Sequence, residues 1–455
     1  MNTDGKMRLA ALVHATGSHP ASWIHPDTKP NASTDIDSYA SMAETAERGK
    51  LDLFFIADTP AARTDNLHAW SRFPMFMNVF EPVTLLSTLA SRTRYIGLGG
   101  TVSTSFTEPY NVARQFASLD HLSHGRAAWN VVTSANDYAA RNFGLDKLPE
   151  HATRYERAQE FVEVVKALWD TWEDDAFIYD RTSGVYFDPQ KQHAVDHQGK
   201  FFTLHGALNI ARSPQGHPVI IQAGASDTGK DFAAATAEVV FGSDVTLEAG
   251  QRFYRDLKGR MSKFGRSPDQ LKVLAGLTVI VGESEQEAQD KFATLQAMIH
   301  PDVGRMRISA DLEVDLSDLP LDEPIPEERI PKTANFHKAY FDHIVDLIRL
   351  EKLTLRQLYM RYERGRKTFA GNAKQVADVM EEWFTGGAAD GFMLVFQIQP
   401  NGIQDFVNFV VPELQRRELF RTEYTGAMLR DHLGLERPVN RHVVGSIRKS
   451  LDAAQ

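Results

Sequence analysis

The chain has 455 residues, which is enough for two or three average domains or for one large domain with insertions. Its hydrophobic fraction of 42%, charged fraction of 24% and formal net charge of −10 are ordinary for a soluble globular protein, and no basic stripe indicates nucleic acid or a membrane as a partner. The absence of cysteine excludes disulfides, thiolate metal sites, iron–sulfur clusters and cysteine nucleophiles. Because the amino-terminal apolar run is too short for a secretory signal and no apolar run could span a membrane, we expect a cytoplasmic protein.

Short apolar runs alternate with longer segments of helical periodicity along the whole chain. Eight runs are expected to be strands, at residues 7–13, 51–56, 95–101, 126–132, 218–223, 238–242, 271–281 and 391–397. Helical spacing of apolar residues is clear in 37–50, 81–93, 111–125 and 154–172. Parallel neighbours need crossover connections, so alternating strands and helices predict a parallel sheet, and eight such units favour a (β/α)8 barrel.

Two irregular stretches interrupt this alternation. Residues 173–217 and 300–335 are too long to be plain connectors, and we expect them to be insertions over the face of the barrel at which the strands end. The second is rich in Pro, Asp and Glu with low apolar periodicity, which predicts a lid of low intrinsic order that closes over a ligand. No repeat or linker divides the chain, so we expect a single barrel domain over 1–455 with a carboxyl-terminal extension at about 420–455.

Polar side chains follow at least five of the predicted strands. His14 follows the first, Asp58 the second, Thr104 the third, and Thr133 and Ser134 the fourth, while the fifth runs into the sequence QAGASDTGKD. In a (β/α)8 barrel the carboxyl ends of the strands meet at one face, where the chemistry takes place. The sequence therefore predicts a shared polar pocket at this face.

The segment after the fifth strand could bind a phosphate. Gly224, Ala225 and Ser226 let the backbone approach a ligand closely, and a helix begins near Asp227 with free N–H groups. An ordinary strand-to-helix turn, with Ser226 or Asp227 as the N-cap, explains the same residues equally well. Neither a Walker loop nor a Gly-x-Gly-x-x-Gly pattern is present.

Other candidate residues also have a plain structural alternative. Asp58 could be a base, a metal ligand or a hydrogen-bond partner of a heterocycle, or only a turn carboxylate. His151 and Tyr155 are four residues apart on one helix face and could grip a phosphate or a ring edge, or be a surface histidine and a core tyrosine. Arg63 and Arg141 follow strand ends and could attract a carboxylate or sulfonate, or be solvated loop residues.

Metal-dependent and serine hydrolases are not indicated by the sequence. His14, His19 and His25 lie in one loop without a carboxylate partner, and no His-Glu-x-x-His or His-x-His element occurs. The Gly-x-Ser-x-Gly elbow of serine hydrolases is also missing. We therefore expect no metal site and no catalytic triad.

Several stretches resemble the bacterial luciferase-like flavin-dependent monooxygenases. They include FFIADT, EPVTLLSTLASRTRYIGLGGTVSTSFTEPYNVARQFASLDHLSHGRAAWNVVTS, HATRYERAQEFVEVVKALW, GKFFTLHGALNIARSPQGHPVIIQAGAS and AATAEVVF. More narrowly, the chain resembles the branch of nitrilotriacetate monooxygenase component A and dibenzothiophene sulfone monooxygenase. The resemblance runs in the same order from about residue 7 to about residue 435, and it is specific for the branch rather than for a substrate.

The resemblance implies a barrel that takes reduced FMN from a separate NAD(P)H-dependent flavin reductase and reacts it with O2. The resulting C4a-peroxyflavin would oxygenate a small xenobiotic, aminopolycarboxylate or organosulfur substrate, and the protein would exclude water and orient the substrate. The family's FMN contacts correspond here to Asp58 near the isoalloxazine, Thr104 after the third strand, His151 and Tyr155 near the phosphate or ribityl chain, and Ser226, beside Ala225, at the phosphate.

The resemblance also implies what sets this chain apart. Long-chain alkane monooxygenase has a cysteine and a histidine after its first strand and a histidine after its fourth, where this chain has His14, Gly17 and Tyr138, so we do not expect an alkane substrate. His14, at the end of the first strand, is the candidate hydrogen-bond donor or acid near the flavin, and family habit suggests a homodimer or homotetramer. The alternatives on the same barrel are an F420-dependent oxidoreductase and a non-catalytic flavin-binding protein.

Overall fold

A computed structural model describes residues 4–443, apart from 135, 243, 245, 334–337 and 364–367. Eight parallel strands form a ring in the order β10-β9-β4-β3-β2-β1-β13-β11, which the pairing of β10 with β11 closes. The strands are β1 (Arg8–Leu12), β2 (Leu53–Ile56), β3 (Gly97–Ser103), β4 (Ala127–Val132), β9 (Val219–Gln222), β10 (Val239–Gly242), β11 (Lys272–Gly282) and β13 (Gly391–Phe396). The predicted (β/α)8 barrel and all eight predicted strands are confirmed.

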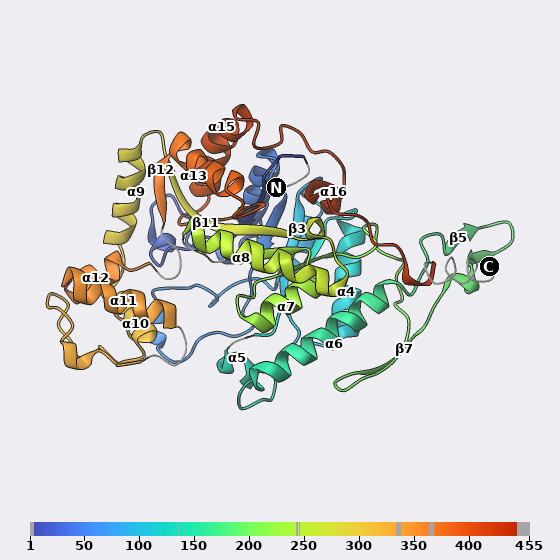
Figure 1. Cartoon of the computed structure of the whole chain (residues 1–455), viewed down its shortest axis with the longest axis horizontal. Helices are drawn as coiled ribbons and strands as arrows, with labels where there is room; N and C mark the ends of the chain where they lie inside the picture. The colour runs from blue at the N-terminus through green and yellow to red at the C-terminus, as the bar shows by residue number, and fades with distance from the viewer. Residues whose placement is uncertain are drawn as a thin grey trace.

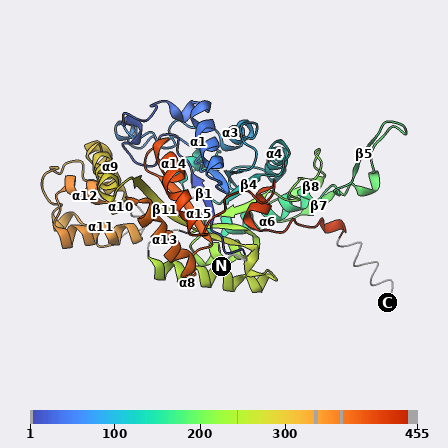
Figure 2. The same ribbon diagram turned by 90° about the horizontal axis from the view of Figure 1, so that it is seen from above.

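Most of the helices lie around the outside of this barrel, and the others lie beside it or at one of its ends (Figures 1 and 2). They are α1 (Ile36–Arg48), α2 (Leu67–Trp70), α3 (Pro82–Leu89), α4 (Pro109–Leu122), α5 (Asp137–Arg141), α6 (His151–Trp169), α7 (Asp227–Thr236), α8 (Leu247–Arg260), α9 (Glu285–Ala297), α10 (Pro301–Leu312), α11 (Lys338–Glu351), α12 (Leu355–Arg361), α13 (Ala373–Thr385), α14 (Asn401–Asp405), α15 (Val411–Arg416) and α16 (Leu429–Leu433). None of the helices in these described residues is both long and apolar enough to cross a membrane.

Side chains alternate between the two faces of each strand. On β4, Trp129 points outward and packs against Phe116 and Phe161 of the covering helices, whereas Ala128 belongs to the apolar cluster inside the barrel. There is little free space inside the barrel. A Cβ at Gly99 would lie 3.1 Å from Cδ1 of Leu53, so a larger residue where β3 faces the interior would require the neighbouring side chains to shift.

Residues 173–217 contain two β-hairpins that the sequence analysis did not predict. They are β5 (Phe177–Asp180) with β6 (Val185–Phe187), and β7 (Val195–Gln198) with β8 (Thr203–Gly206). The segment follows a helix and precedes β9, so it leaves the amino-terminal face of the barrel, not the face at which the strands end. The expectation that it lies over the face at which the strands end was therefore wrong. The hairpin β5–β6 extends away from the barrel (Figures 1 and 2), whereas β7–β8 packs against α6, where Glu160 accepts hydrogen bonds from Phe201 N (3.0 Å) and Phe202 N (2.9 Å).

The insertion at 300–335 is part of a larger helical module. Within it, α10 is a regular helix rather than an irregular segment, and it packs with α11 and α12 around an apolar cluster of its own that includes Ile308, Leu312 and Leu358. The short strand β12 (Phe369–Asn372) follows and pairs with the end of β11. Residues 334–335 lie outside the described part.

The carboxyl-terminal extension closes the amino-terminal end of the barrel. Leu429 and Leu433 of α16 belong to the apolar cluster inside the barrel, and Arg430 forms an ion pair with Glu238 (2.7 Å) and donates to the carbonyl of His217 (2.9 Å). The amino-terminal end of the barrel is thus closed, and its open end lies at the carboxyl ends of the strands. Residues 444–455 lie outside the described part.

Candidate active site

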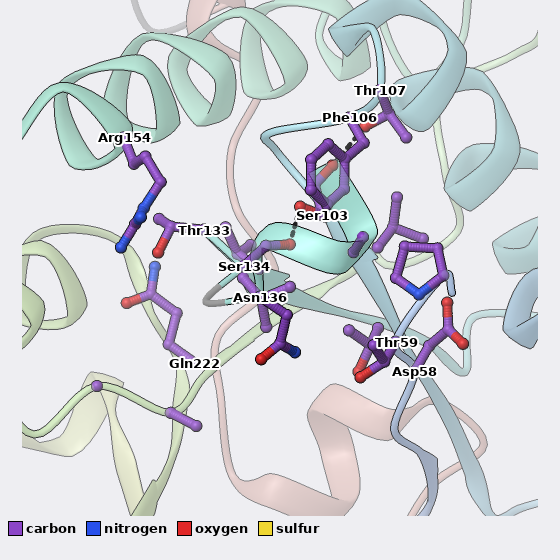
Figure 3. A pocket seen from close by; sticks show the side chains of 18 of the residues that line it. Asp58, Thr59, Ser103, Phe106, Thr107, Thr133, Ser134, Asn136, Arg154 and Gln222 are labelled. Atoms are coloured by element: carbon purple, nitrogen blue, oxygen red, sulfur yellow. Dashed lines mark hydrogen bonds between the residues drawn. The ribbon is translucent and has the colours of Figure 1, made fainter. Parts of the chain in front are cut away.

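A cavity of about 510 Å³ lies at the carboxyl ends of the strands, where the sequence predicted it (Figure 3). Loops and helices that follow β2, β3, β4 and β9 form its wall. Its lining comprises Asp58, Thr59, Pro60, Glu81, Thr101, Val102, Ser103, Phe106, Thr107, Val131, Val132, Thr133, Ser134, Asn136, Ala139, Phe143, His151, Arg154, Tyr155, Gln222, Ala223, Gly224, Gly229 and Phe232.

The hydroxyl groups at the ends of β3 and β4 hold this wall together. The Oγ atoms of Ser103 and Ser134 are 2.7 Å apart, and the Asn130 amide donates to Thr101 Oγ1 at 2.9 Å. Ser134 adopts a left-handed conformation (φ 54°), which ends the strand and turns its hydroxyl toward β3. The polar cluster after this core strand therefore both ends the strand and lines the cavity.

One side of the cavity is cationic. Figure 3 shows Arg154, Thr133 and Gln222 gathered there. Arg154 donates from Nη1 to the carbonyl of Pro149 (3.1 Å), and its Nε is buried with no hydrogen-bond partner among the described residues. Because a buried unpaired donor is costly, this group is suited to an anionic ligand.

The start of α7 lies beside this arginine. Ser226 is its N-cap and accepts a hydrogen bond from Gly229 N (3.1 Å). A Cβ at Gly229 would lie 3.1 Å from the hydroxyl of Tyr155, so a glycine is what lets that hydroxyl approach the helix. The positive end of the helix dipole and the guanidinium together favour negative charge.

The opposite side of the cavity carries carboxylates. Asp58 lies there (Figure 3), and burial, together with the charge of Glu81, raises its pKa to about 6. Glu81 is itself the N-cap of α3 and accepts hydrogen bonds from the backbone of Val83 (3.0 Å) and Thr84 (2.7 Å). The two ends of the cavity therefore differ in charge.

Three of the six residues predicted to bind a cofactor meet at this cavity. Asp58, His151 and Tyr155 line it, and the rings of the last two lie 4.7 Å apart, as their spacing on α6 predicted. Ala225 and Ser226 are exposed beside the lining residue Gly224 and do not line the cavity themselves.

Thr104 does not line the cavity. Its side chain is buried, and its hydroxyl donates to the carbonyl of Val132 at 3.1 Å. The cavity is instead lined by its neighbour Ser103, because alternate residues of an extended chain point to opposite sides. The structure thus gives the hydroxyl after the third strand a role in joining β3 to β4.

His14 lies in a second, smaller cavity of about 40 Å³. The two cavities lie near each other at the end of β2, since Ala57 lines the small cavity and Asp58 the large one. Burial lowers the pKa of His14 to about 4, so the imidazole is neutral at pH 7, and its ring meets Phe76 edge-on at 5.6 Å.

The predicted substrate contacts lie outside the cavity. Arg63 donates to Asp65 (2.8 Å) and lies over the rings of Trp70 (4.9 Å) and Tyr138 (4.7 Å), so its charge is already compensated. Arg141 is exposed at the end of α5. None of Arg63, Tyr138 and Arg141 lines the described cavity.

The sequence analysis missed Arg154, Gln222 and Glu81, and the aromatic pair Phe106 and Phe143, whose rings stack 4.5 Å apart in the cavity wall. A signal for Arg154 was available, because it lies three residues after His151 and so shares its helix face. No cluster of three or more His, Asp or Glu side chains that could hold a metal ion occurs among the residues with described positions.

A closed parallel barrel with a polar cavity at the carboxyl ends of its strands has the arrangement of a (β/α)8 enzyme. Comparison with known proteins identifies the family. Residues 17–390 match the profile of the luciferase-like monooxygenases, and the chain belongs to this family.

Named relatives cover nearly the whole chain. Nitrilotriacetate monooxygenase component A of Aminobacter aminovorans is 47% identical over 97% of this chain and 99% of its own length. N-acetyl-S-(2-succino)cysteine monooxygenase of Bacillus subtilis (strain 168) is 45% identical over 96% and 98%, respectively. The solved structure of DmoA from Hyphomicrobium sulfonivorans is 33% identical, covers 94% of this chain and 92% of its own, and has a TM-score of 0.84. The protein is therefore a monooxygenase, as the resemblance implied.

Proposed function

We propose that the protein oxygenates a small organic substrate with O2 and reduced FMN, which a separate NAD(P)H-dependent flavin reductase supplies. The observation that carries this proposal is the division of the cavity into a cationic end, at Arg154 and the start of α7, and a hydrogen-bonding end at Asp58. FMN has the matching parts, since it joins a phosphate to a heterocycle with several hydrogen-bonding atoms.

The residues at the cationic end fit a phosphate. The guanidinium of Arg154, the hydroxyl of Tyr155 and the backbone N–H groups at the start of α7 would hold it, with Ser226 shaping the helix start. Hydroxyl groups of Thr101 and Ser103 line the cavity toward the other end and would bind the ribityl chain or the ring edge.

When bound, reduced FMN supplies the electrons that activate O2, and the chain's own residues control the surroundings. The stacked rings of Phe106 and Phe143 and the side chains of Val131 and Val132 form an apolar wall that excludes water. With its pKa near 6, the Asp58 carboxyl is mainly ionised at pH 7 and would accept a hydrogen bond from a ring N–H.

The small cavity beside Asp58 would serve the substrate side of the reaction. His14 is neutral at pH 7 and would donate a hydrogen bond from its imidazole N–H toward the reacting atoms. The names of the relatives point to small organic substrates with nitrogen or sulfur, such as aminopolycarboxylates and thioethers. The loop after β2 carries Arg63, and the short helix after β4 carries Tyr138 and Arg141. We propose these three residues as substrate contacts.

The phosphate end is tested with Arg154→Gln and two ligands, reduced FMN and reduced riboflavin, which lacks the phosphate. Losing a charge-assisted hydrogen bond costs about 1.5–3 kcal/mol, so we expect the dissociation constant for reduced FMN to rise by roughly 10- to 100-fold. That for reduced riboflavin should stay within about twofold, because the remaining contacts are unchanged. Anaerobic fluorescence titration measures both.

A matched control is Arg114→Gln, which removes an exposed arginine on α4, outside the cavity. It should leave both dissociation constants unchanged. Equal weakening of FMN and riboflavin by Arg154→Gln, or no weakening of either, would contradict the assignment of the phosphate to this end.

A further inference from the structure

The first residue of α7, Asp227, lies close to the end of the cavity that would hold the phosphate. It directly follows the N-cap Ser226, and its side chain is 82% exposed. A carboxylate in the first turn stabilises a helix, but it also repels an anion that binds at the same helix start. The charge of Asp227 therefore opposes a ligand phosphate at this position.

Two cationic side chains are held against this carboxylate. Nη2 of Arg260, the last residue of α8, lies 2.7 Å from Oδ1 of Asp227, and Nζ of Lys230 lies 3.1 Å from the same oxygen. Only 15% of the Arg260 side chain and 16% of the Lys230 side chain are exposed, although such side chains usually extend into water. Their hydrogen bonds hold the pKa of Asp227 below its usual value, so the carboxylate and both cations are charged at pH 7.

Arg260 also ties the start of α7 to α8, which lies beside it (Figure 1). Its Nη1 donates to the carbonyl of Asp227 at 3.2 Å and forms an ion pair with Asp231 (2.9 Å), while its Nε pairs with Asp256 (2.7 Å). Lys230 pairs with Asp256 as well, at 2.5 Å. We call Asp227, Lys230, Asp231, Asp256 and Arg260 the α7–α8 charge cluster. With three carboxylates and two cations, this cluster keeps one negative charge in excess.

The same turn of α7 also faces the cavity. Gly229 lines the cavity beside the hydroxyl of Tyr155. Arg154 lines the cavity too, and its buried Nε has no hydrogen-bond partner among the described residues. The first turn of α7 thus lies between the charge cluster and the groups that would bind the phosphate. Over so short a distance, and partly through the protein, the charges of the cluster act on the ligand with less screening than in water.

We propose that the α7–α8 charge cluster sets the affinity of the protein for the phosphate of FMN. Asp227 weakens the binding of the phosphate, and the positioning residues Arg260 and Lys230 offset most of this effect while they fix the helix start. The inference rests on the proposed function, because it takes the phosphate end of the cavity from there. A limited affinity suits a flavin that arrives reduced and leaves oxidised in each turnover, since slow release of oxidised FMN would limit the rate.

The test is an anaerobic fluorescence titration at low ionic strength with two ligands, reduced FMN and reduced riboflavin. Arg260→Gln should raise the dissociation constant for reduced FMN by about fivefold, and Asp227→Asn should lower it by about fivefold, as expected for one partly screened unit charge near a phosphate. The values for reduced riboflavin should stay within about twofold, because riboflavin has no phosphate.

The double variant Arg260→Gln with Asp227→Asn separates charge from structure. Its cluster has the original net charge, so it should bind reduced FMN within about twofold of the unaltered chain. A merely structural role of the cluster would instead weaken binding in both single variants and most of all in the double variant. Arg255→Gln, which removes an exposed arginine from the same helix α8, is the matched control and should leave both dissociation constants unchanged.

Equal weakening of FMN and riboflavin by Arg260→Gln, or an Asp227→Asn variant that does not bind reduced FMN more tightly, would overturn the inference. If Arg154→Gln weakens reduced FMN selectively while changes in the cluster have no effect, only this inference fails and the proposed function stands. If the unaltered chain binds reduced FMN no more tightly than reduced riboflavin, the phosphate end itself is wrong, and the inference fails with it.

Discussion

Asp58 combines a buried carboxyl group with a carboxylate neighbour, and its raised pKa has a consequence for stability. The group ionises near pH 3.8 when the chain is unfolded and near pH 6 when it is folded, so folding is penalised as the pH rises through this range and fully penalised above it. Asp58→Asn should therefore raise the free energy of unfolding at pH 8 by about 1–2 kcal/mol, allowing for solvent screening.

This gain should shrink as the pH falls from 6 toward 4, because the carboxyl is then neutral in the folded state. Urea denaturation at pH 8 and pH 4.5 measures the difference. An equal effect at both pH values would mean that packing, rather than charge, determines the stability of this site.

His14 is the residue whose chemical role is most open to test. In His14→Ala we expect the dissociation constant for reduced FMN to stay within about twofold, since His14 lines the adjacent cavity rather than the larger one. The share of reduced flavin that yields product should fall, with hydrogen peroxide released instead. Because the pKa of His14 is about 4, this share should show no histidine titration between pH 5.5 and 9. Unchanged coupling in the variant would remove His14 from the reaction.

At the scale of elements, α16 acts as the floor of the barrel. Leu429 is fully buried inside the barrel. A Cβ at Gly97, the first residue of β3, would lie 2.5 Å from Cδ1 of Leu429, so the two residues are closely packed. Leu429→Ala should lower the free energy of unfolding by about 2–5 kcal/mol, the usual cost of a cavity in a core that cannot collapse. The exposed control Leu350→Ala should cost less than about 0.5 kcal/mol. A similar, small effect of both would show that the extension does not support the barrel.

The α10–α12 module contacts the loop after β2, which carries Asp58. His68 on α2 lies 2.9 Å from Asp302 of α10, and Arg72 donates to His300 at 3.1 Å. Binding of a ligand in the cavity should therefore affect the order of the module. We expect reduced FMN to slow proteolysis within residues 313–333, the irregular stretch after α10. Limited proteolysis followed by mass spectrometry locates the cuts. Equal rates with and without reduced FMN would count against a lid.

For the whole molecule, the strands of the barrel were the part that the sequence predicted best. Each is a short apolar run with a helix after it, and this pattern depends only on local periodicity and on the burial of both strand faces. The clustering of Asp58, His151 and Tyr155 followed from the same topology, because it places the ends of all strands at one face.

The remaining features depend on contacts between residues far apart in sequence. The strands β5–β8 have only three or four residues each, and their Asp-, Gly- and His-rich surroundings hide them. The expected face for residues 173–217 was wrong. The segment connects a helix, α6, to a strand, β9, and this order places its ends at the amino-terminal face, but the prediction did not take the order into account. Whether Ser103 or Thr104 faces the cavity depends on where β3 ends, and a one-residue difference reverses the side.

Use of reduced FMN by this protein is tested most directly by an anaerobic titration of the purified protein with reduced FMN, repeated with reduced F420, followed by exposure to O2. We expect saturable binding of one reduced FMN per chain with a micromolar or lower dissociation constant, weaker binding of F420, and consumption of O2 by the bound flavin. Tighter binding of F420, or reduced FMN that fails to bind, would contradict it.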